Sequence, residues 1–207
     1  MSAKLPARGA LRTFAAVEVP DDLLKALGRV QAQLGSRGVR ARWVRPENLH
    51  LTLKFLGATP RERVEAVVAA LDAAASAHMA FALTATGIGV FPNPRRPRVI
   101  WAGLSGATDA LARLQEEIDR RLEAVGFPRE ARRFHGHLTL GRFAEGAAGM
   151  GIDAAIAAHA AERFGSFEVR EVVLFQSDLQ AKGAVYTALA RASLKAPRLD
   201  SPRRHQE

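Results

Sequence analysis

One tetrapeptide occurs twice in this chain, once in each half. His50-Leu51-Thr52-Leu53 recurs as His137-Leu138-Thr139-Leu140. Each copy follows a segment whose apolar residues recur at helical spacing, about 22–34 before the first copy and 108–126 before the second. A repeated helix–loop–strand unit predicts two related lobes, each of which contributes one strand that carries the tetrapeptide.

Alternation along a strand determines where the repeated side chains point, because residues two apart lie on the same face. The histidine and threonine of each copy therefore share one face, and its two leucines share the other. In the first strand, the same alternation places Lys54 on the histidine face and Phe55 on the leucine face. If the leucines pack on a core, we expect both strands to present their histidines and threonines to one cleft.

The rest of the hydrophobic pattern predicts strands at 12–19, 42–44, 50–56, 81–91, 99–104, 137–143, 167–175 and 184–192. It predicts helices at 22–34, 59–76 and 108–126, with a further short helix after residue 143. Asp21 or Asp22 is expected to cap the first helix, and Gly57 to end the third strand. Because several strands follow one another directly, the pattern indicates an α+β fold with mainly antiparallel sheets. In a bilobal arrangement, the two pseudo-symmetric lobes would line a central cleft and carry their helices outside.

Composition narrows the classes of protein to consider. The net charge of +9 favours anionic partners such as nucleic acid, although an arginine-rich composition alone also explains it. The absence of cysteine excludes disulfides and cysteine-based metal sites. No apolar run reaches the roughly 18 residues that cross a bilayer, and the N-terminus lacks the apolar core of a signal peptide. We expect a monomeric cytoplasmic protein with one domain at 11–195, between disordered ends at 1–10 and 196–207.

Two histidines and two threonines in one cleft suit the opening of a cyclic phosphodiester. One neutral imidazole takes a proton from the attacking water, and one imidazolium gives a proton to the leaving ribose oxygen. Histidine suits both tasks because its ordinary pKa is about 6.5. The threonine hydroxyls, Thr52 and Thr139, can donate hydrogen bonds to the non-bridging phosphate oxygens. This chemistry requires neither a metal ion nor a cofactor.

The motif sequences HLTLKFLG and HGHLTLGR resemble those of the 2H phosphoesterase superfamily, whose signature is two H-x-[ST]-x motifs. The chain is most similar to the RNA 2′,3′-cyclic phosphodiesterase family, first described as bacterial 2′-5′ RNA ligases. The similarity extends to the stretches RTFAAVEVP, RWVRPENLHLTLKFLG, GVFPNPRRPRVIWAGL and VVLFQSDLQAKGAVYTALA.

The resemblance implies a bilobal α+β fold with a pseudo-twofold axis. It also implies that His50 is the general acid, that His137 is the general base, and that the product carries a terminal 2′-phosphate. One position departs from the family, which usually has proline before the second motif, where this chain has Gly136 preceded by His135.

The sequence leaves two alternatives to hydrolysis open. The same site run in reverse would make a 2′-5′ RNA ligase, and a chain whose histidines are relics would be a non-catalytic RNA-binding module. The substrate is either RNA with a cyclic phosphate end or a small cyclic nucleotide. A metal site at His135 and His137 would need further ligands, and none is obvious nearby.

Several other residues are candidates for contacting the substrate. Strand alternation and composition do not decide their roles. Strict alternation puts Arg142 on the leucine face, whereas a bulge at Gly141 would turn it toward the phosphate. Lys54 either meets the substrate or is a solvated lysine at a strand edge. Two further sets either contact RNA or serve only as core and surface residues: the aromatic residues Trp43, Phe91 and Tyr186, and the loop arginines Arg95, Arg96 and Arg98.

Overall fold

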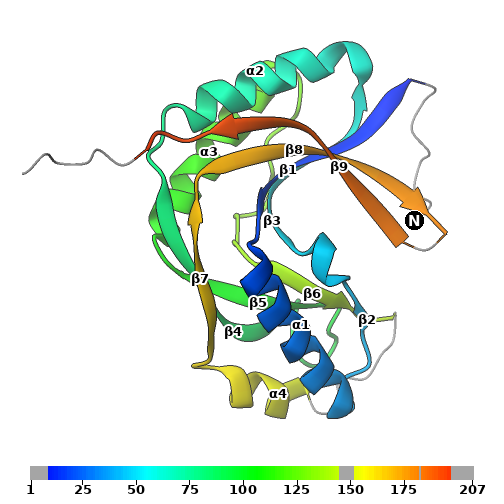
Figure 1. The fold of residues 1–207 in the computed structure, drawn as a ribbon. Helices are drawn as coiled ribbons and strands as arrows, with labels where there is room; N and C mark the ends of the chain where they lie inside the picture. The colour runs from blue at the N-terminus through cyan, green and yellow to red at the C-terminus, as the bar shows by residue number, and fades with distance from the viewer. Residues whose placement is uncertain (1–8, 145–151, 182, 197–207) are drawn as a thin grey trace, which may run out of the picture.

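The computed structural model describes residues 9–144, 152–181 and 183–196, which form a strongly curved antiparallel sheet with helices packed against it (Figure 1). The elements are, in chain order, β1 (Ala10–Glu18), α1 (Asp21–Ser36), β2 (Arg42–Trp43), β3 (His50–Pro60), α2 (Val64–Ala75), β4 (Phe81–Phe91), β5 (Val99–Gly106), α3 (Thr108–Ala124), β6 (Leu138–Arg142), α4 (Ile152–His159), β7 (Arg163–Val169), β8 (Glu171–Gln180) and β9 (Gly183–Ser193). Two short 3-10 helices, η1 (Pro46–Asn48) and η2 (Arg61–Arg63), precede β3 and α2.

The two strands that carry the repeated tetrapeptide lie side by side in the middle of the sheet. The strand order is β7-β4-β5-β6-β3-β1-β8-β9, with β2 paired to β6 off this path. β3 and β6 meet at a single antiparallel pair, Leu51 opposite Leu138. Each half of the sheet therefore carries one copy of the motif at its inner edge, and the predicted α+β fold of two lobes is confirmed.

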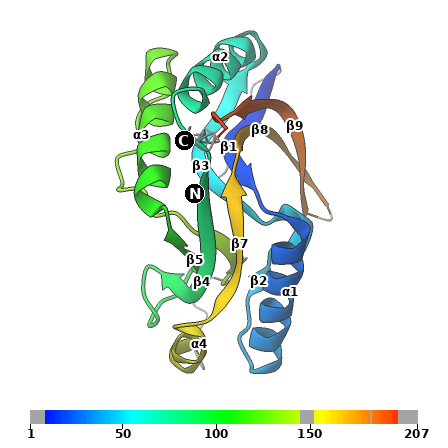
Figure 2. The same cartoon turned by 60° about the vertical axis from the view of Figure 1, so that its left-hand side comes forward.

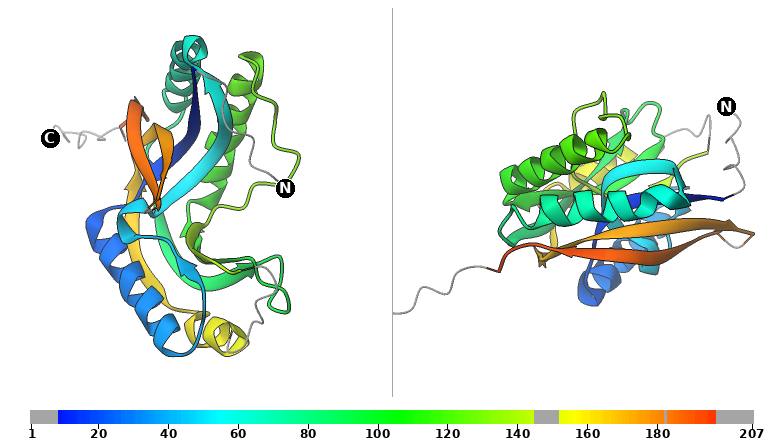
Figure 3. Two further views of the ribbon diagram at one scale, coloured as in Figure 1. Left: turned by 90° about the vertical axis from the view of Figure 1, so that its right-hand side faces the viewer. Right: turned by 90° about the horizontal axis from the view of Figure 1, so that it is seen from above.

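The helices divide between the two halves of the sheet. α2 and α3 pack on each other and on β3, β8 and β9, whereas α1 packs on β7 and α4 on β4. Figures 2 and 3 show these two helix pairs at opposite ends of the molecule. No helix within the described residues is both long and apolar enough to cross a lipid bilayer.

The motif leucines hold the two central strands on the core. Leu51, Leu138 and Leu140 are completely buried, and Leu53 is 2% exposed. They belong to the same apolar cluster as the inward face of α3. Burying a leucine side chain contributes about 1.5–3 kcal/mol. These four residues therefore fix both strands from behind and leave the opposite face free for the histidines.

The start of α1 differs from the predicted cap. Pro20 occupies the N-cap position, and no side chain caps the helix. The carbonyl of Pro20 accepts hydrogen bonds from Leu23 N and Leu24 N, both at 3.0 Å. The prediction that Asp21 or Asp22 caps the helix is therefore wrong. Both carboxylates lie in the first turn, where the helix dipole favours negative charge.

Two strand boundaries also differ from the predictions. β3 continues past Gly57 to Pro60, because Gly57 adopts φ +72°, which a glycine tolerates inside an irregular strand. The single strand predicted at 167–175 is two strands: β7 pairs with β4, and β8 pairs with β1 in the other half of the sheet. The adjacent charged residues Arg170 and Glu171 interrupt the alternation at this point, but local pattern does not reveal that the chain changes its pairing partner there.

The predicted disordered ends lie outside the described residues, except for Gly9, Ala10 and Ala196. Ala10 already belongs to β1. The single domain at 11–195 stays a prediction.

Candidate active site

The face of β3 and β6 that lies opposite the leucines borders one cavity of about 680 Å³, which we call the central cavity. It brings together all five residues predicted for the site: His50, Thr52, His137, Thr139 and Arg142. Because Leu51 lies opposite Leu138, the two histidines are diagonal neighbours across the strand pair. In antiparallel ladders, such neighbours have Cα atoms about 7–8 Å apart, which leaves room for one phosphate between the two rings.

The two imidazoles are held in the same way. His50 Nδ1 donates to the carbonyl of Asn48 at 2.7 Å, and His137 Nδ1 donates to the carbonyl of His135 at 2.7 Å. A carbonyl can only accept a hydrogen bond, so each Nδ1 carries the proton. Each Nε2 is then the nitrogen that exchanges a proton with a ligand. Both accepting carbonyls belong to the residue two places before the histidine. This common spacing is the feature of the sequence that could have predicted them.

The walls around the two histidines are aromatic, and the sequence did not identify all of them. The Phe14 ring lies 4.8 Å from that of His50, and Tyr186 meets His50 edge-on at 5.3 Å. Phe91 meets His137 edge-on at 5.2 Å. Phe14 gave no signal in the sequence, because its position in an apolar strand also suits a core residue.

Burial lowers the pKa of both histidines below the ordinary value of 6.5. For His50, the hydrogen bond to Asn48 opposes this effect, whereas the positive charges of Arg142 and His137 lower the pKa further. For His137, the hydrogen bond to His135 opposes the effect of burial, and the charges of His135 and Arg142 add to it. An empty site therefore favours neutral imidazoles, and a bound anion favours the protonated form.

Arg142 reaches the central cavity through a β-bulge. Ile100 of β5 pairs with Gly141, and Trp101 pairs with Thr139, so Leu140 is the extra residue. One extra residue reverses the alternation that follows it. Arg142 therefore lies on the histidine side, as the bulge alternative required.

A matching bulge in β3 overturns the predicted positions of Lys54 and Phe55. Ala15 of β1 pairs with Lys54 and Ala16 pairs with Thr52, so Leu53 is the extra residue. Lys54 is 2% exposed on the core side, and Phe55 is 57% exposed beside the cavity. Lys54 is thus not a solvated edge lysine, and it does not border the central cavity.

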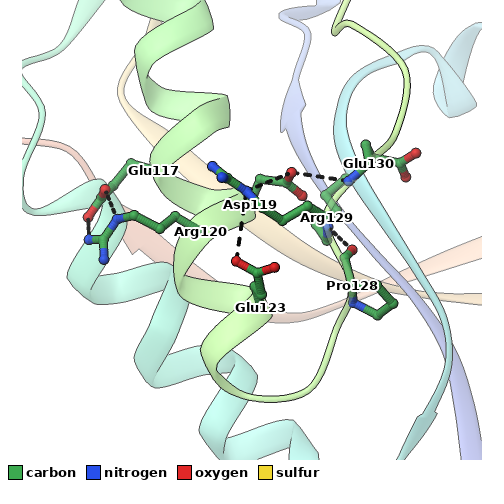
Figure 4. A network of polar contacts seen from close by, with 8 residues as sticks. Glu117, Asp119, Arg120, Glu123, Pro128, Arg129 and Glu130 are labelled. Carbon is green, nitrogen blue, oxygen red and sulfur yellow. Dashed lines mark hydrogen bonds and ion pairs between the residues drawn. The ribbon is translucent and has the colours of Figure 1, made fainter.

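The buried Lys54 ties the first motif strand to the segment that leads to the second motif. Its ammonium group forms an ion pair with Asp119 of α3 and donates to the carbonyl of Pro128 at 2.7 Å. The other carboxylate oxygen of Asp119 accepts from Glu130 N at 3.1 Å, and Arg129 lies 3.8 Å away. Figure 4 shows Asp119, Pro128, Arg129 and Glu130 gathered where α3 meets the segment that follows it.

The remaining candidates divide between packing and the rims of cavities. Trp43 packs against Gly141, where an added Cβ would lie 3.0 Å from its ring. Tyr186 borders the central cavity, and Phe91 borders a neighbouring one. Arg98 borders the same neighbouring cavity as Phe91, whereas Arg95 and Arg96 border none of the cavities described here.

The glycine that replaces the family's proline fits its surroundings closely. A Cβ at Gly136 would lie 2.7 Å from Leu111 Cδ2, so any side chain there would displace that leucine. Within the described part of the chain, no three or more His, Cys, Asp or Glu side chains gather where they could hold a metal ion, and His135 with His137 gains no third ligand.

The central cavity is arranged to receive an anion. Arg12 and Arg142 border it together with the two histidines, and no carboxylate borders it among the described residues. Hydroxyl groups of Thr52 and Thr139 supply hydrogen-bond donors on the same face. The geometry therefore offers two proton-exchanging nitrogens, two hydroxyls and two guanidinium groups to a phosphate.

Comparison with known proteins identifies the family of this chain. The model of the family described as LigT-like phosphoesterases matches residues 17–101 and 104–186, and each matched stretch contains one motif. The chain is 35% identical to the RNA 2′,3′-cyclic phosphodiesterase of Archaeoglobus fulgidus over 180 residues, which cover 86% of this chain and 98% of that relative.

Two solved structures share the fold of this chain. The crystal structure of TT0787 of Thermus thermophilus has a TM-score of 0.72 at 32% sequence identity, with 90% of this chain and 99% of that chain covered. The crystal structure of Escherichia coli LigT complexed with 3′-AMP has a TM-score of 0.68 at 26% identity, with 90% and 98% covered.

Proposed function

This chain belongs to the LigT-like phosphoesterase family, and on that premise we propose that it hydrolyses the 2′,3′-cyclic phosphate at RNA ends to a 2′-phosphomonoester, using two histidines and no metal ion. One observation carries the proposal. Two imidazoles, each anchored through Nδ1 to a carbonyl two residues earlier, border one cavity that is lined by arginines and not by carboxylates among the described residues. The activity after which the Archaeoglobus fulgidus relative is named supports a cyclic phosphate on RNA as the substrate.

The proton transfers follow from the two free nitrogens. A water oxygen attacks the phosphorus and gives its proton to Nε2 of His137. The bond between phosphorus and the ribose 3′ oxygen breaks, and His50 Nε2 protonates that oxygen. The product keeps the phosphate on the 2′ oxygen. The assignment of acid and base rests on the family resemblance, and a proton exchange with solvent restores both histidines.

The other site residues stabilise the charge on the phosphate. Thr52 and Thr139 donate hydrogen bonds to the non-bridging oxygens, and the guanidinium group of Arg142 faces the same oxygens. Because the substrate is an anion, its binding raises the pKa of both histidines above their values in the empty site. Binding therefore helps to charge the general acid.

The test is hydrolysis of a 2′,3′-cyclic mononucleotide with and without EDTA, with the position of the product phosphate determined by phosphorus NMR. We expect a 2′-phosphate and full activity in EDTA. Loss of activity in EDTA that zinc restores would contradict the metal-independent mechanism. A 3′-phosphate product would contradict the direction of cleavage.

Two further experiments with the same protein distinguish hydrolysis from ligation and from RNA binding without turnover. A radiolabelled RNA with a cyclic end, incubated with a 5′-hydroxyl partner, yields a longer product only if the chain ligates. Tight, salt-sensitive RNA binding without turnover would instead favour a binding module. The cytoplasmic location and the monomeric state remain predictions.

A further inference from the structure

A second cavity, of about 810 Å³, adjoins the central cavity. It shares Thr52, Phe55 and His137 with the central cavity, so a ligand can extend from one into the other. We call it the basic cavity, and its defining residues are Phe55, Phe91, Arg98, Arg132, Arg133 and Phe134.

Charge distinguishes the basic cavity from the cavity on the other side of His50. That third cavity, of about 1010 Å³, is bordered by two arginines and five carboxylates: Glu18, Asp21, Glu47, Glu168 and Glu171. Arg191 pairs with two of these carboxylates and Arg170 with a third, so the carboxylates still outnumber the guanidinium groups. In the basic cavity, Glu130 is the one acidic residue among the described lining residues. A polyanion that leaves the central cavity is therefore repelled from the third cavity and attracted to the basic cavity. A fourth cavity, bordered by Arg40, Arg42, Arg45 and Arg142, also carries positive charge, so the choice between it and the basic cavity rests on the side chains described next.

The side chains of the basic cavity are suited to single-stranded nucleic acid. Arg132 and Arg133 are exposed, and neither forms a hydrogen bond or ion pair with another described residue. Phe55 presents an exposed ring at the junction with the central cavity. Arginines that follow a phosphate backbone beside aromatic rings on which bases stack are typical of sites for single strands.

We propose that the basic cavity binds the single-stranded nucleotides that precede the cyclic phosphate in an RNA substrate. The inference rests on the proposed function, because it assumes that the terminal phosphate lies between His50 and His137. A cyclic phosphate occupies the 3′ end of RNA, so the rest of the polymer extends from the 5′ oxygen of the terminal ribose. Arg132 and Arg133 then contact its backbone, and Phe55 stacks on a base. The preferred substrate is consequently an oligonucleotide with an unpaired end and not a cyclic mononucleotide.

The experiment compares kcat/KM for a 2′,3′-cyclic mononucleotide with that for a series of cyclic-ended oligonucleotides of increasing length. We expect the wild-type value to rise with length and to level off when the basic cavity is full. In Arg132→Ala/Arg133→Ala, the rise with length is lost, while the mononucleotide is hydrolysed as before. The slope of log kcat/KM against log salt for the oligonucleotide falls by about 1.4 in magnitude, from about 0.7 for each phosphate contact in a single strand.

The matched control is Arg29→Ala/Arg37→Ala, which removes the same charge from exposed positions at α1. We expect this variant to keep the dependence on length. Equal losses in both double variants would overturn the proposal, because they would report net charge alone. A wild-type enzyme that uses the mononucleotide as well as the longest oligonucleotide would overturn it too.

A binding measurement keeps the test independent of turnover. Fluorescence anisotropy with a labelled oligonucleotide that ends in a 2′-phosphate should show weaker binding in Arg132→Ala/Arg133→Ala than in the control. Unchanged binding would overturn the proposed RNA site. Absent hydrolysis with this loss of binding would instead contradict the proposed function and leave the RNA site supported.

Discussion

The two motif strands are alike up to their bulges and differ after them. In both strands, a carbonyl two residues earlier holds Nδ1 of the histidine, and one extra residue at the second leucine reverses the alternation. The residue five places after the histidine then borders the central cavity in both. It is Phe55 in β3 and Arg142 in β6. The shared features orient the two histidines for proton transfer. The residue that differs supplies an aromatic ring from β3 and a positive charge from β6.

The residue just after the extra leucine shows a second difference. In β3 it is Lys54, whose side chain is buried in an ion pair with Asp119. In β6 it is Gly141, whose missing side chain leaves space for Trp43 of β2. The first strand is therefore tied to α3 and to the segment before His137, whereas the second is packed against a neighbouring strand. The two strands therefore share the tetrapeptide, the carbonyl anchors and the bulge, and they differ in what packs beside the bulge.

The largest expected effect tests the part that the two strands share. If both histidines transfer protons, His50→Ala and His137→Ala should each lower kcat by about 10²–10⁴-fold. Kinetics with a cyclic mononucleotide measure this, and thermal unfolding of both variants checks that the fold is retained. If either variant kept most of the activity, the histidine that it lacks would not transfer a proton, and the similarity of the two histidines would be only structural.

The next largest effect is on stability, and it tests the buried ion pair that Lys54 adds to the first strand and that Gly141 cannot add to the second. Lys54→Met leaves the carboxylate of Asp119 buried without its ammonium partner, which should lower the free energy of unfolding by about 3–5 kcal/mol. Urea denaturation measures the change as a lower midpoint at an unchanged slope. The control Lys54→Met/Asp119→Leu removes both charges and should recover most of the loss. A single variant as stable as the wild type would mean that the ion pair does not anchor the first strand.

The two bulges also show which features of the site the sequence can predict and which it cannot. Helical and strand periodicities located the core leucines and the common face of the histidines and threonines, because these depend on local alternation. Gly141 signalled a possible bulge, since a glycine in a strand often marks one, and Arg142 lies where that alternative placed it. The bulge at Leu53 carries no glycine, so strict alternation placed Lys54 and Phe55 on the wrong faces.

Long-range pairing accounts for the other differences. Asp119 is 65 residues from Lys54, and no local pattern connects the two. The division of the strand predicted at 167–175 into β7 and β8 has the same origin, since each part pairs with a strand from another half of the sheet. The charge contrast between the cavities beside the site likewise arises from residues far apart in the chain.

A third effect tests the charge that only the second strand contributes. Arg142→Gln should lower kcat by about 10²–10³-fold, the usual cost of removing one donor to a developing negative charge. It should also move the pH profile of kcat/KM. Burial lowers the pKa of both histidines, and Arg142 lowers both further, so the profile of the wild type should centre on the acid side of 6.5.

Loss of the positive charge of Arg142 removes a repulsion that destabilises both imidazolium forms, so the pKa values of both histidines rise. The bell-shaped profile of Arg142→Gln should therefore shift to higher pH. Phe55→Leu in the other strand is the matched control, because it changes the equivalent position without changing charge, and its profile should keep the wild-type position. A shift in Phe55→Leu, or none in Arg142→Gln, would show that the difference between the strands is not electrostatic.

The smallest effect asks whether the phosphate lies midway between the strands. If the antiparallel register of the leucine pair is continued by one step, Thr139 falls opposite His50, and Thr52 falls opposite His137. Each hydroxyl thus accompanies the histidine of the other strand. Thr52→Val and Thr139→Val each remove one hydrogen bond from a hydroxyl to an anionic phosphate oxygen, worth about 1.5–3 kcal/mol, so each should lower kcat by about 10- to 150-fold. Equal losses that add in the double variant place the phosphate at the centre. A loss confined to one variant assigns the phosphate oxygens to a single strand, and unchanged kinetics in both would remove the hydroxyls from the mechanism.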